Sequence, residues 1–267
     1  MKGLWQRHTI KRVCMAWIGI GVTVAALAVS PQTADRNALW RKVHDICAVK
    51  AKEGIFPPSP CIEMHAGYGG YAIFKDQHGL YQYLLIPSSR ISGIESPKLL
   101  QSDAPNYFAL AWNARRYVER AIGAKQPRDA MSLVLNSREG RSQDQLHIHV
   151  DCIREDVHNT IVQQLPHLSD RWAWLSEGLP PSRHRYMARR LDTESLSIDP
   201  LKDLNRALPS GDHLSAHSLV VVGVSDPTTG PGFVLLSGRV DEAHADHGNA
   251  DDLQDTACSI AQRSERP

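Results

Sequence analysis

The sequence lacks the charge surplus of a typical nucleic-acid-binding protein. Among its 267 residues, 30 Lys and Arg are balanced by 29 Asp and Glu. Proteins that hold nucleic acid by charge usually carry a clear basic excess, so we expect no nucleic-acid partner. There is also only one long apolar run, which excludes a transporter with several membrane spans. With 42% hydrophobic and 22% charged residues, the composition is that of a globular protein rather than of a disordered chain.

The N-terminal segment lacks acidic residues altogether. The first acidic residue is Asp35, whereas residues 1–34 contain four Lys or Arg, all of which precede the uncharged run 13–30. As a helix with a rise of about 1.5 Å per residue, this run would be about 27 Å long, which is enough to span a bilayer core. Basic residues beside a span favour the cytoplasmic side. We therefore predict that residues 1–34 form a basic cytoplasmic tip and a signal-anchor helix at about 13–30.

This prediction makes residues 35–267 the exported domain of a single-pass membrane protein, facing the periplasm or the exterior. Two other interpretations of the run stay open: a signal peptide that is cleaved at Ala26-Leu27-Ala28, and a buried core helix. Residues 35–267 hold 26 basic and 29 acidic residues, a formal charge of −3. Binding of an anion must therefore come from a local site rather than from net charge.

The cysteines agree with export. Cys14 lies in the apolar run, which leaves Cys47, Cys61, Cys152 and Cys258, an even number suited to an oxidising compartment. Four cysteines allow three pairings. We favour Cys47–Cys61, which closes a short loop with three prolines, and Cys152–Cys258, which ties the C-terminal tail to the centre of the chain. The alternative is four free buried thiols.

The hydrophobic pattern of residues 35–267 predicts an α+β fold with a mostly antiparallel sheet and flanking helices. Apolar residues spaced three and four apart predict helices at 35–51 and 106–122. Short apolar or alternating runs predict strands at 71–74, 81–86, 130–136, 145–152, 186–190, 218–224 and 232–240. The first two strands and the last two each form a predicted hairpin. We expect the acidic tail at 241–255 to be a solvated loop or a short helix.

The strongest chemical signal is the run QLHIHV at 145–150, in which polar and apolar residues alternate. In a strand, Gln145, His147 and His149 project from one face, and such groups are costly on a buried strand unless they serve a site. In one interpretation the histidines bind a metal together with His65, His213 or an acid. In another, the central imidazole is a nucleophile toward phosphorus. The third is a pair of structural, hydrogen-bonded histidines.

The residues before this strand favour phosphorus chemistry. Residues 136–143, NSREGRSQ, run from the end of a predicted strand into a polar loop that contains Gly140. Such a loop can aim backbone N–H groups, a hydroxyl and an amide at one phosphate. No acidic cluster of the kind that a two-metal phosphatase needs lies beside it in the sequence. We therefore expect no metal and no other cofactor.

This order of an Asn, a Gly-containing loop, Ser-Gln and a His strand resembles the histidine-triad (HIT) superfamily of nucleotide hydrolases and transferases. The closer resemblance is to the membrane-anchored CDP-diacylglycerol pyrophosphatases, and it covers most of the chain, weakening after about residue 195. It is carried by the N-terminal anchor, PSPC at 58–61, YLLIP at 83–87, IESP at 94–97, LNSR at 135–138, GRSQ at 140–143 and HIH at 147–149. A bare H-x-H pair would be a weak signal, whereas this ordered set is specific.

The resemblance implies a role for each matching residue. His147 matches the central, nucleophilic histidine, and His149 matches the last triad histidine, which contacts the phosphate. Gln145 departs from the pattern, because the first triad position is usually histidine and an amide hydrogen-bonds but does not titrate. Three further matches orient the imidazole or hold phosphate oxygens, and they are Asn136, Ser142 and Gln143. Asp76 sits where relatives have an Asp that binds ribose hydroxyls; the other interpretation is a turn-capping Asp.

The activity that the resemblance implies is hydrolysis of the diphosphate bond of CDP-diacylglycerol. His147 would attack the α-phosphorus, and water would hydrolyse the cytidylyl-histidine intermediate, yielding CMP and phosphatidate. One alternative is a nucleotidyltransferase that passes the cytidylyl group to another acceptor. The other is a non-catalytic, membrane-anchored protein that binds nucleotide lipids. In each case the partners are CDP-diacylglycerol and membrane lipid.

The resemblance also implies a HIT-like fold, in which a dimer builds one sheet across two subunits. The predicted hairpin at 218–240 faintly echoes the one at 71–86 in its hydrophobic pattern. We therefore divide residues 35–267 into a catalytic half, 35–155, and a second half, 156–267, that is a possible degenerate repeat. The protein is then either a monomeric pseudo-dimer or a homodimer.

The helix predicted at 106–122 carries residues with two interpretations each. Tyr107, Phe108 and Trp112 either belong to the core or form an interfacial entry for the lipid. Arg115 and Arg116 either contact the diphosphate or are solvated.

The fate of the N-terminal segment is directly testable. If residues 13–30 are an uncleaved anchor, protein extracted from membranes keeps its full mass and begins at the first residue of the basic tip. Gel mobility and N-terminal sequencing of the extracted protein measure this. A mature N-terminus just after Ala28 would contradict the anchor.

Overall fold

The computed structural model describes residues 35–261. The predicted anchor at 13–30 therefore lies outside the described residues. Within residues 35–261, no helix is both long and apolar enough to cross a membrane.

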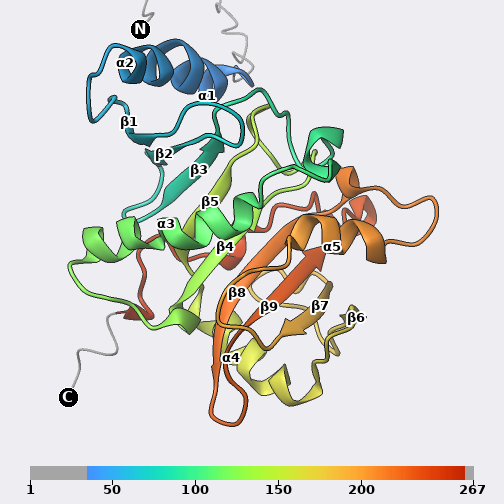
Figure 1. Cartoon of the computed structure of the whole chain (residues 1–267). Helices are drawn as coiled ribbons and strands as arrows, with labels where there is room; N and C mark the ends of the chain where they lie inside the picture. Colours follow the sequence, from blue (N-terminus) through green and yellow to red (C-terminus); the bar gives the residue numbers. More distant parts are fainter. Residues whose placement is uncertain (1–34, 262–267) are drawn as a thin grey trace, which may run out of the picture. The chain divides into compact units, whose positions relative to one another are not determined.

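The described residues build one sheet with the strand order β1-β2-β3-β5-β4-β8-β9-β7-β6 (Figure 1). Every pair of neighbouring strands is antiparallel. The strands are β1 (Cys61–Met64), β2 (Tyr71–Lys75), β3 (Tyr83–Pro87), β4 (Met131–Leu135), β5 (Ile148–Cys152), β6 (Ala173–Trp174), β7 (Tyr186–Leu191), β8 (Leu219–Asp226) and β9 (Gly230–Gly238). The predicted hairpins are present as β2–β3 and β8–β9, and the α+β class is confirmed.

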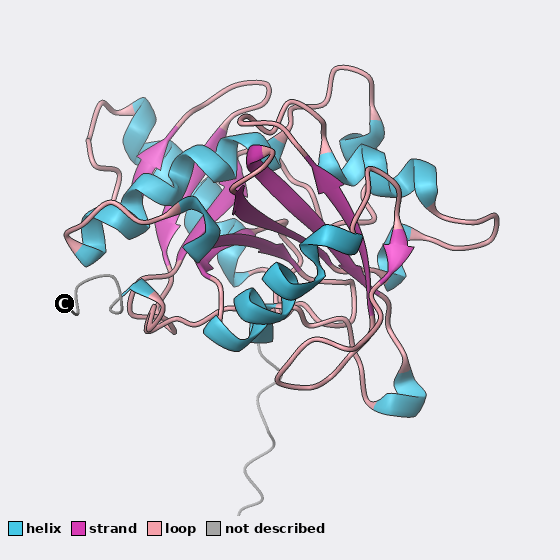
Figure 2. Cartoon of the chain, turned by 90° about the horizontal axis from the view of Figure 1, so that it is seen from below, coloured by secondary structure: helices cyan, strands magenta, loops and turns pink. Residues whose placement is uncertain are grey.

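Helices lie on both sides of this sheet (Figure 2). They are α1 (Ala38–Arg41), a π-helical segment (Lys42–Cys47), α2 (Ala48–Lys52), α3 (Tyr107–Ile122), α4 (Glu155–Gln164) and α5 (Pro200–Ala207). Short 3-10 segments occur at Pro97–Leu100, Arg128–Ala130, Leu165–His167, Leu214–Ala216, Glu242–His244 and Asp251–Leu253. The helix predicted at 106–122 is α3: the Asn106 side chain caps its N-terminus by accepting from the Ala109 N–H, and Gly123 ends it at φ 86°.

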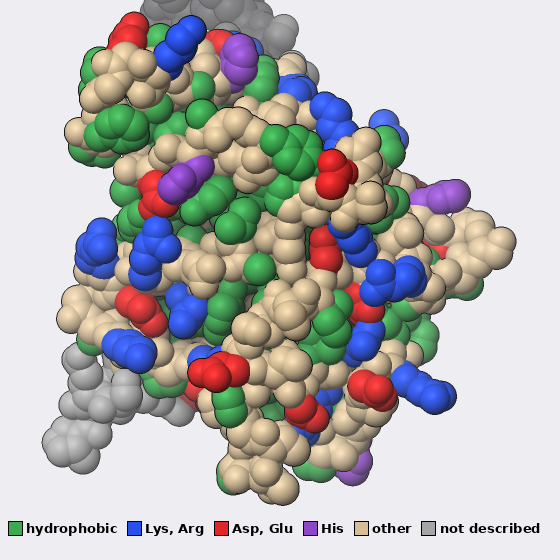
Figure 3. Space-filling model, in the orientation of Figure 1, with side chains coloured by type: hydrophobic (Ala, Val, Ile, Leu, Met, Phe, Trp, Pro, Cys, Tyr) green, Lys and Arg blue, Asp and Glu red, His purple; other side chains and the backbone are tan. Residues whose placement is uncertain are grey.

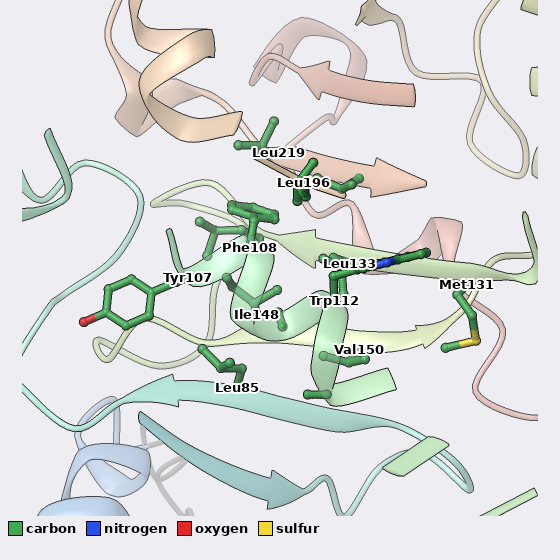
Figure 4. Packing of buried hydrophobic residues seen from close by; sticks show 14 of the residues in the cluster. Leu85, Tyr107, Phe108, Trp112, Met131, Leu133, Ile148, Val150, Leu196 and Leu219 are labelled. Atoms are coloured by element: carbon green, nitrogen blue, oxygen red, sulfur yellow. The ribbon is translucent and has the colours of Figure 1, made fainter. Parts of the chain in front are cut away.

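Helix α3 packs against β3, β4 and β5 and covers one face of the sheet. Tyr107, Phe108 and Trp112 are 5%, 2% and 5% exposed and pack among strand residues such as Leu133 and Ile148 (Figure 4). These aromatic residues therefore belong to the core, and the interpretation as a lipid entry is wrong.

Arg115 and Arg116 of α3 both have partners within the protein. The Arg115 guanidinium lies 4.7 Å from the ring centre of Trp112, and Arg116 forms an ion pair with Glu63 at 2.8 Å. On the face that carries α3 and α5, Lys and Arg alternate with Asp and Glu instead of forming one continuous basic surface (Figure 3).

The opposite face of the sheet carries two separate apolar clusters. One joins β1, β2 and β3 to the N-terminal helical segment through residues such as Leu84 and Val43. The other joins β4, β7, β8 and β9 to α4. Between them runs β5, which presents His149 and Asp151 to this face, because Ile148, Val150 and Cys152 point to α3. A polar band therefore interrupts the core where β5 passes.

The predicted strand at 145–152 is shorter than expected. β5 begins at Ile148, and Gln145 and His147 lie in the irregular segment that leads into it. His149 keeps its strand position, opposite Leu84 of β3 and Val134 of β4. The expectation that all three polar residues share one strand face is therefore wrong for Gln145, whose side chain has other partners, described below.

The order of elements occurs twice along the chain. β2-β3-α3-β4-β5 in the first half corresponds to β6-β7-α5-β8-β9 in the second. In the sheet, the orders β2-β3-β5-β4 and β6-β7-β9-β8 meet at the antiparallel pair β4–β8, where Leu133 lies opposite Val221. A two-fold rotation through this pair would superpose the two strand orders.

The expectation of a solvated loop or a short helix for the acidic tail holds only for its first part. Residues 241–245 are exposed and include the 3-10 segment Glu242–His244, whereas the following residues cross the sheet on the face opposite α3. Ala250 and Leu253 are buried in the cluster that contains α4. The Gln254 side chain donates to the Ser132 hydroxyl at 3.0 Å, and the Asp255 N–H donates to the Cys152 carbonyl at 3.0 Å. These contacts join residues more than 100 positions apart, which a local pattern cannot reveal.

Both predicted disulfides are present. Cys47–Cys61 links the N-terminal helical segment to β1, with 5.8 Å between the two Cα atoms. Cys152–Cys258 links the end of β5 to the tail, with 5.2 Å between the Cα atoms. The alternative of four free thiols is therefore wrong.

The two disulfides should differ in their effect on stability. They close loops of 14 and 106 residues, and the chain-entropy model assigns about 3 kcal/mol to a short loop and about 4.7 kcal/mol to a loop of this longer size. We expect C152S/C258S to lower the free energy of unfolding by about 1.5 kcal/mol more than C47S/C61S. Urea unfolding of the two double variants measures this, with Cys14→Ser as the control. Equal losses, or a larger loss for C47S/C61S, would contradict the loop-length argument.

Candidate active site

A pocket of about 180 Å³ opens beside the polar band on the face opposite α3. Its walls come from β2, β3, β5, the loop before β5 and the N-terminal helical segment. The lining residues are Ala38, Leu39, Lys42, Phe74, Asp76, Gln77, His78, Leu84, Ser142, Gln143, His147 and His149. The structure thus brings together five predicted site residues, namely Asp76, Ser142, Gln143, His147 and His149. Asn136 and Gln145 lie outside the lining.

The orientation of His147 is fixed by its own backbone neighbour. Its Nδ1 lies 2.7 Å from the carbonyl oxygen of Gln145, and the ring is 6% exposed. A carbonyl only accepts hydrogen bonds, so Nδ1 carries the proton and donates it. Nε2 of the neutral ring then keeps a free lone pair, which is the atom a nucleophile needs.

Burial keeps this ring neutral. It lowers the pKa of His147 to about 4, and the neighbouring His149 adds to the effect, whereas the hydrogen bond to Gln145 opposes it. Asp251 and Asp76 are close enough to raise the value somewhat. The imidazole is therefore uncharged at neutral pH, and Nε2 is available without a separate base.

The surroundings of His149 favour the binding of a ligand. Its ring centre lies 5.1 Å from that of His147, and it is 7% exposed. Within the described residues, neither Nδ1 nor Nε2 has a hydrogen-bond partner. Burial lowers its pKa to about 4 as well, with Asp76 opposing. Buried polar atoms are almost always hydrogen-bonded in proteins, so an unpartnered imidazole that lines a pocket favours a bound oxygen ligand.

The side chain of Gln145 hydrogen-bonds to backbone groups and does not line the pocket. Its Nε2 donates to the carbonyls of Pro87 and Ser89, each at 3.0 Å, and its Oε1 accepts from the Ile91 N–H at 3.4 Å. The side chain is fully buried. The amide therefore fixes residues 87–91 against the segment whose carbonyl orients His147.

Gln143 lines the pocket, yet its amide is already engaged. Its Oε1 accepts from the Leu39 N–H at 2.8 Å, and its Nε2 donates to the Asp35 carbonyl at 3.1 Å. Arg36 adds a bidentate pair with Asp144 at 2.8 and 2.9 Å and holds the pKa of that carboxyl at about 2. These contacts join the loop before β5 to residues 35–39. Within this loop, Ser142 contributes a hydroxyl to the lining of the pocket.

Asn136 holds the C-terminal tail in place. Its Oδ1 accepts from the Ala250 N–H at 2.8 Å, and its side chain also hydrogen-bonds Asp251. Burial raises the pKa of Asp251, although the bond to Asn136 opposes this. The structure therefore places Asn136 outside the pocket lining, where it holds the tail segment whose Asp251 carboxylate acts on His147.

Two features near the site were not predicted from the sequence. Lys42 lines the pocket from the N-terminal helical segment, and Asp251 of the tail acts electrostatically on His147. No local motif marks either residue, because both reach the site through contacts with distant parts of the chain. The only available signals were the cysteines, since the disulfides bring exactly these two segments to the sheet.

The two further histidines considered as metal ligands, His65 and His213, do not reach the pocket. The His65 side chain is 51% exposed and pairs with Glu63, and neither His65 nor His213 lines the pocket. Within residues 35–261, no group of three or more His, Cys, Asp or Glu is arranged to hold a metal ion.

A larger hollow of about 900 Å³ lies elsewhere, between Trp174 of β6, residues 182–185 and residues 239–246. It contains none of the predicted site residues. The smaller pocket is therefore the candidate active site, because it holds the two histidines whose environment is chemically unusual.

A comparison of the whole sequence with known protein families identifies the family. The model of the CDP-diacylglycerol pyrophosphatase family matches residues 34–262. The chain belongs to this family. It is therefore a hydrolase that acts on the diphosphate bond of CDP-diacylglycerol.

The lowered pKa of His147 predicts an unusual pH profile for this pyrophosphatase. Because the ring stays neutral down to about pH 4, kcat/KM for CDP-diacylglycerol should stay level from pH 8 to about pH 5 and fall only below that. An ordinary histidine would place the fall near pH 6.5. Initial rates in detergent micelles measure this, and re-assay at pH 7 after acid exposure controls for inactivation. A fall centred near pH 6.5 would contradict the buried, neutral ring.

Proposed function

We propose that this pyrophosphatase cleaves CDP-diacylglycerol through a covalent cytidylyl-His147 intermediate. The observation that carries the proposal is the hydrogen bond from Nδ1 of His147 to the Gln145 carbonyl. Nε2 attacks the cytidylyl phosphorus, and the bond from this phosphorus to the bridging oxygen breaks. Phosphatidate leaves with the electron pair. Water then attacks the same phosphorus, the P–N bond breaks, and CMP leaves as one water proton passes to solvent.

The same hydrogen bond stabilises the intermediate. Attack by Nε2 places positive charge on the ring while Nδ1 keeps its proton, and the Gln145 carbonyl accepts a stronger bond from a charged donor. His149 has free ring nitrogens and contacts a phosphate oxygen. The Ser142 hydroxyl binds a second oxygen, and Asp76, whose side chain is 15% exposed at the pocket wall, accepts from the ribose hydroxyls. Asn136, Gln143 and Gln145 are positioning residues in this mechanism.

We also propose that residues 35–267 have a HIT-like fold in which one chain forms a pseudo-dimer. The repeated order of elements and the meeting of the two halves at β4–β8 support it. The second half lacks an equivalent histidine pair: β9, the counterpart of β5, carries Val234 and Leu236 on the face where β5 carries His149 and Asp151. A monomer with one active site follows.

For the location of the protein, we propose the bacterial inner membrane, with the hydrolase domain in the periplasm. The apolar run at 13–30 with its basic flank, two disulfides and a lipid substrate support this. A diacylglycerol tail stays in the bilayer, so an enzyme anchored beside the headgroup searches for its substrate in two dimensions.

The test is release of CMP from CDP-diacylglycerol by the purified chain in detergent micelles. We expect His147→Ala to lower kcat at least ~10³-fold, as loss of a nucleophile does, and His149→Ala to lower it ~10²-fold, as loss of one phosphate contact does. His65→Ala is the matched control, since this histidine lies outside the pocket. Chelation with EDTA should leave the rate unchanged.

Two results would contradict the proposal. One is a His147→Ala variant that keeps more than about a tenth of the activity. The other is loss of activity in EDTA that zinc restores, together with a loss in His65→Ala, which would favour the metal interpretation.

A further inference from the structure

The substrate of the proposed function brings negative charge into a pocket whose two histidines are uncharged. The diphosphate of CDP-diacylglycerol carries two negative charges near neutral pH. Burial keeps His147 and His149 uncharged there, and Asp76 adds a carboxylate to the wall. An anion needs a compensating cation in such a buried place.

The nearby arginines do not supply this charge. Arg141 is 6% exposed and forms ion pairs with Glu95 at 2.6 Å and with Asp144 at 3.1 Å. Arg36 forms its bidentate pair with the same Asp144. Both guanidinium groups are therefore matched by carboxylates, namely Asp144 in the loop before β5 and Glu95 in the segment after β3.

Lys42 is the one Lys or Arg among the residues that line the pocket in the described part of the chain. Its Nζ lies 5.2 Å from the ring centre of Phe74, which also lines the pocket. No carboxylate lies within ion-pair distance of it among residues 35–261. Within the described residues, the ammonium group is therefore a cation at the pocket wall that no carboxylate pairs directly, although Asp76 lines the same pocket.

The segment that carries Lys42 is held firmly. The adjacent Val43 is fully buried in the cluster with β1–β3, and Cys47, five residues on, is cross-linked to β1. On the other side, the Leu39 N–H donates to Gln143. The structure therefore fixes the backbone of Lys42 against the loop that carries Ser142.

We propose that Lys42 binds the lipid-side phosphate of the diphosphate, while His147 attacks the cytidylyl phosphorus; this rests on the proposed function. The unpartnered nitrogens of His149 in the same pocket mark the place of a phosphate. Negative charge grows on the lipid-side phosphate as its bond to the cytidylyl phosphorus breaks, so a cation there stabilises the leaving group. Lys42 also follows the predicted anchor by only twelve positions, and the lipid-side phosphate is the one that the acyl chains hold nearest the bilayer.

The kinetic test uses three substitutions in the full chain. Lys42→Met keeps length and removes charge, and it should lower kcat/KM for CDP-diacylglycerol by roughly 10- to 100-fold, the range for a hydrogen bond to a charged group. Lys42→Arg should recover most of this loss. Lys52→Met, on the exposed end of the same helical segment, should match the unchanged chain.

A binding test identifies which phosphate Lys42 contacts. In the His147→Ala chain, which prevents turnover, calorimetry compares CMP with CDP, whose second phosphate stands for the lipid-side group. We expect CDP to bind more tightly than CMP, and the added Lys42→Met substitution to weaken CDP by roughly 10- to 100-fold while changing CMP by less than about threefold.

Equal weakening of CMP and CDP, no effect of Lys42→Met, or an equal effect of Lys52→Met would overturn the proposal. Failure of the proposed function gives a different result. In that case His147→Ala keeps more than about a tenth of the activity, or EDTA abolishes it, whereas the comparison of Lys42→Met with Lys52→Met still decides the role of Lys42.

Discussion

The hydrogen bond between Nδ1 of His147 and the Gln145 carbonyl is the constraint on which the site depends. It selects the tautomer whose Nε2 is free, and it needs the irregular backbone that precedes β5. The Gln145 side chain secures that backbone through three bonds to residues 87–91. Gln145, which stands where the histidine-triad resemblance implies a histidine, thus orients the proposed nucleophile through its carbonyl and fixes the neighbouring backbone through its amide. No titration at this position is required for either task.

The surroundings of β5, on the sheet face opposite α3, explain the shifted pKa values of the titratable groups at the site. Apolar clusters flank β5 on both sides, so burial lowers the pKa values of His147 and His149 to about 4 and raises that of Asp151 to about 7. Keeping polar groups uncharged in such surroundings costs stability. The extensive apolar packing around α3 and two disulfides offset that cost. The disulfides attach the N-terminal helical segment, which lines the pocket, and the tail, whose Asp251 acts electrostatically on His147.

Much of the fold and part of the site could be predicted from the sequence, because local periodicity encodes local structure. The hairpins β2–β3 and β8–β9, the helix α3 and the His149 face of β5 follow directly from such patterns. The cysteine count favours the observed pairing without fixing it, and the roles of Asp76, Ser142 and Gln143 are expected from the family resemblance rather than from periodicity. Lys42 and Asp251 could not be predicted, since they approach His147 only through contacts between distant segments. The later part of the tail was misjudged for the same reason: its acidic composition favours solvent, whereas Ala250, Leu253 and Gln254 bury it against the sheet.

The central claim is that His147 carries the cytidylyl group during turnover. The most direct measurement is a single-turnover reaction with CDP-diacylglycerol, quenched in alkali within milliseconds and analysed by peptide mass spectrometry, because a phosphorus–nitrogen bond to imidazole survives base better than acid. The account predicts a transient adduct of one cytidylyl group on the peptide that contains His147, located on that residue and decaying as CMP appears. An adduct on His149, or CMP formed at the full rate with no adduct at any time, would contradict it.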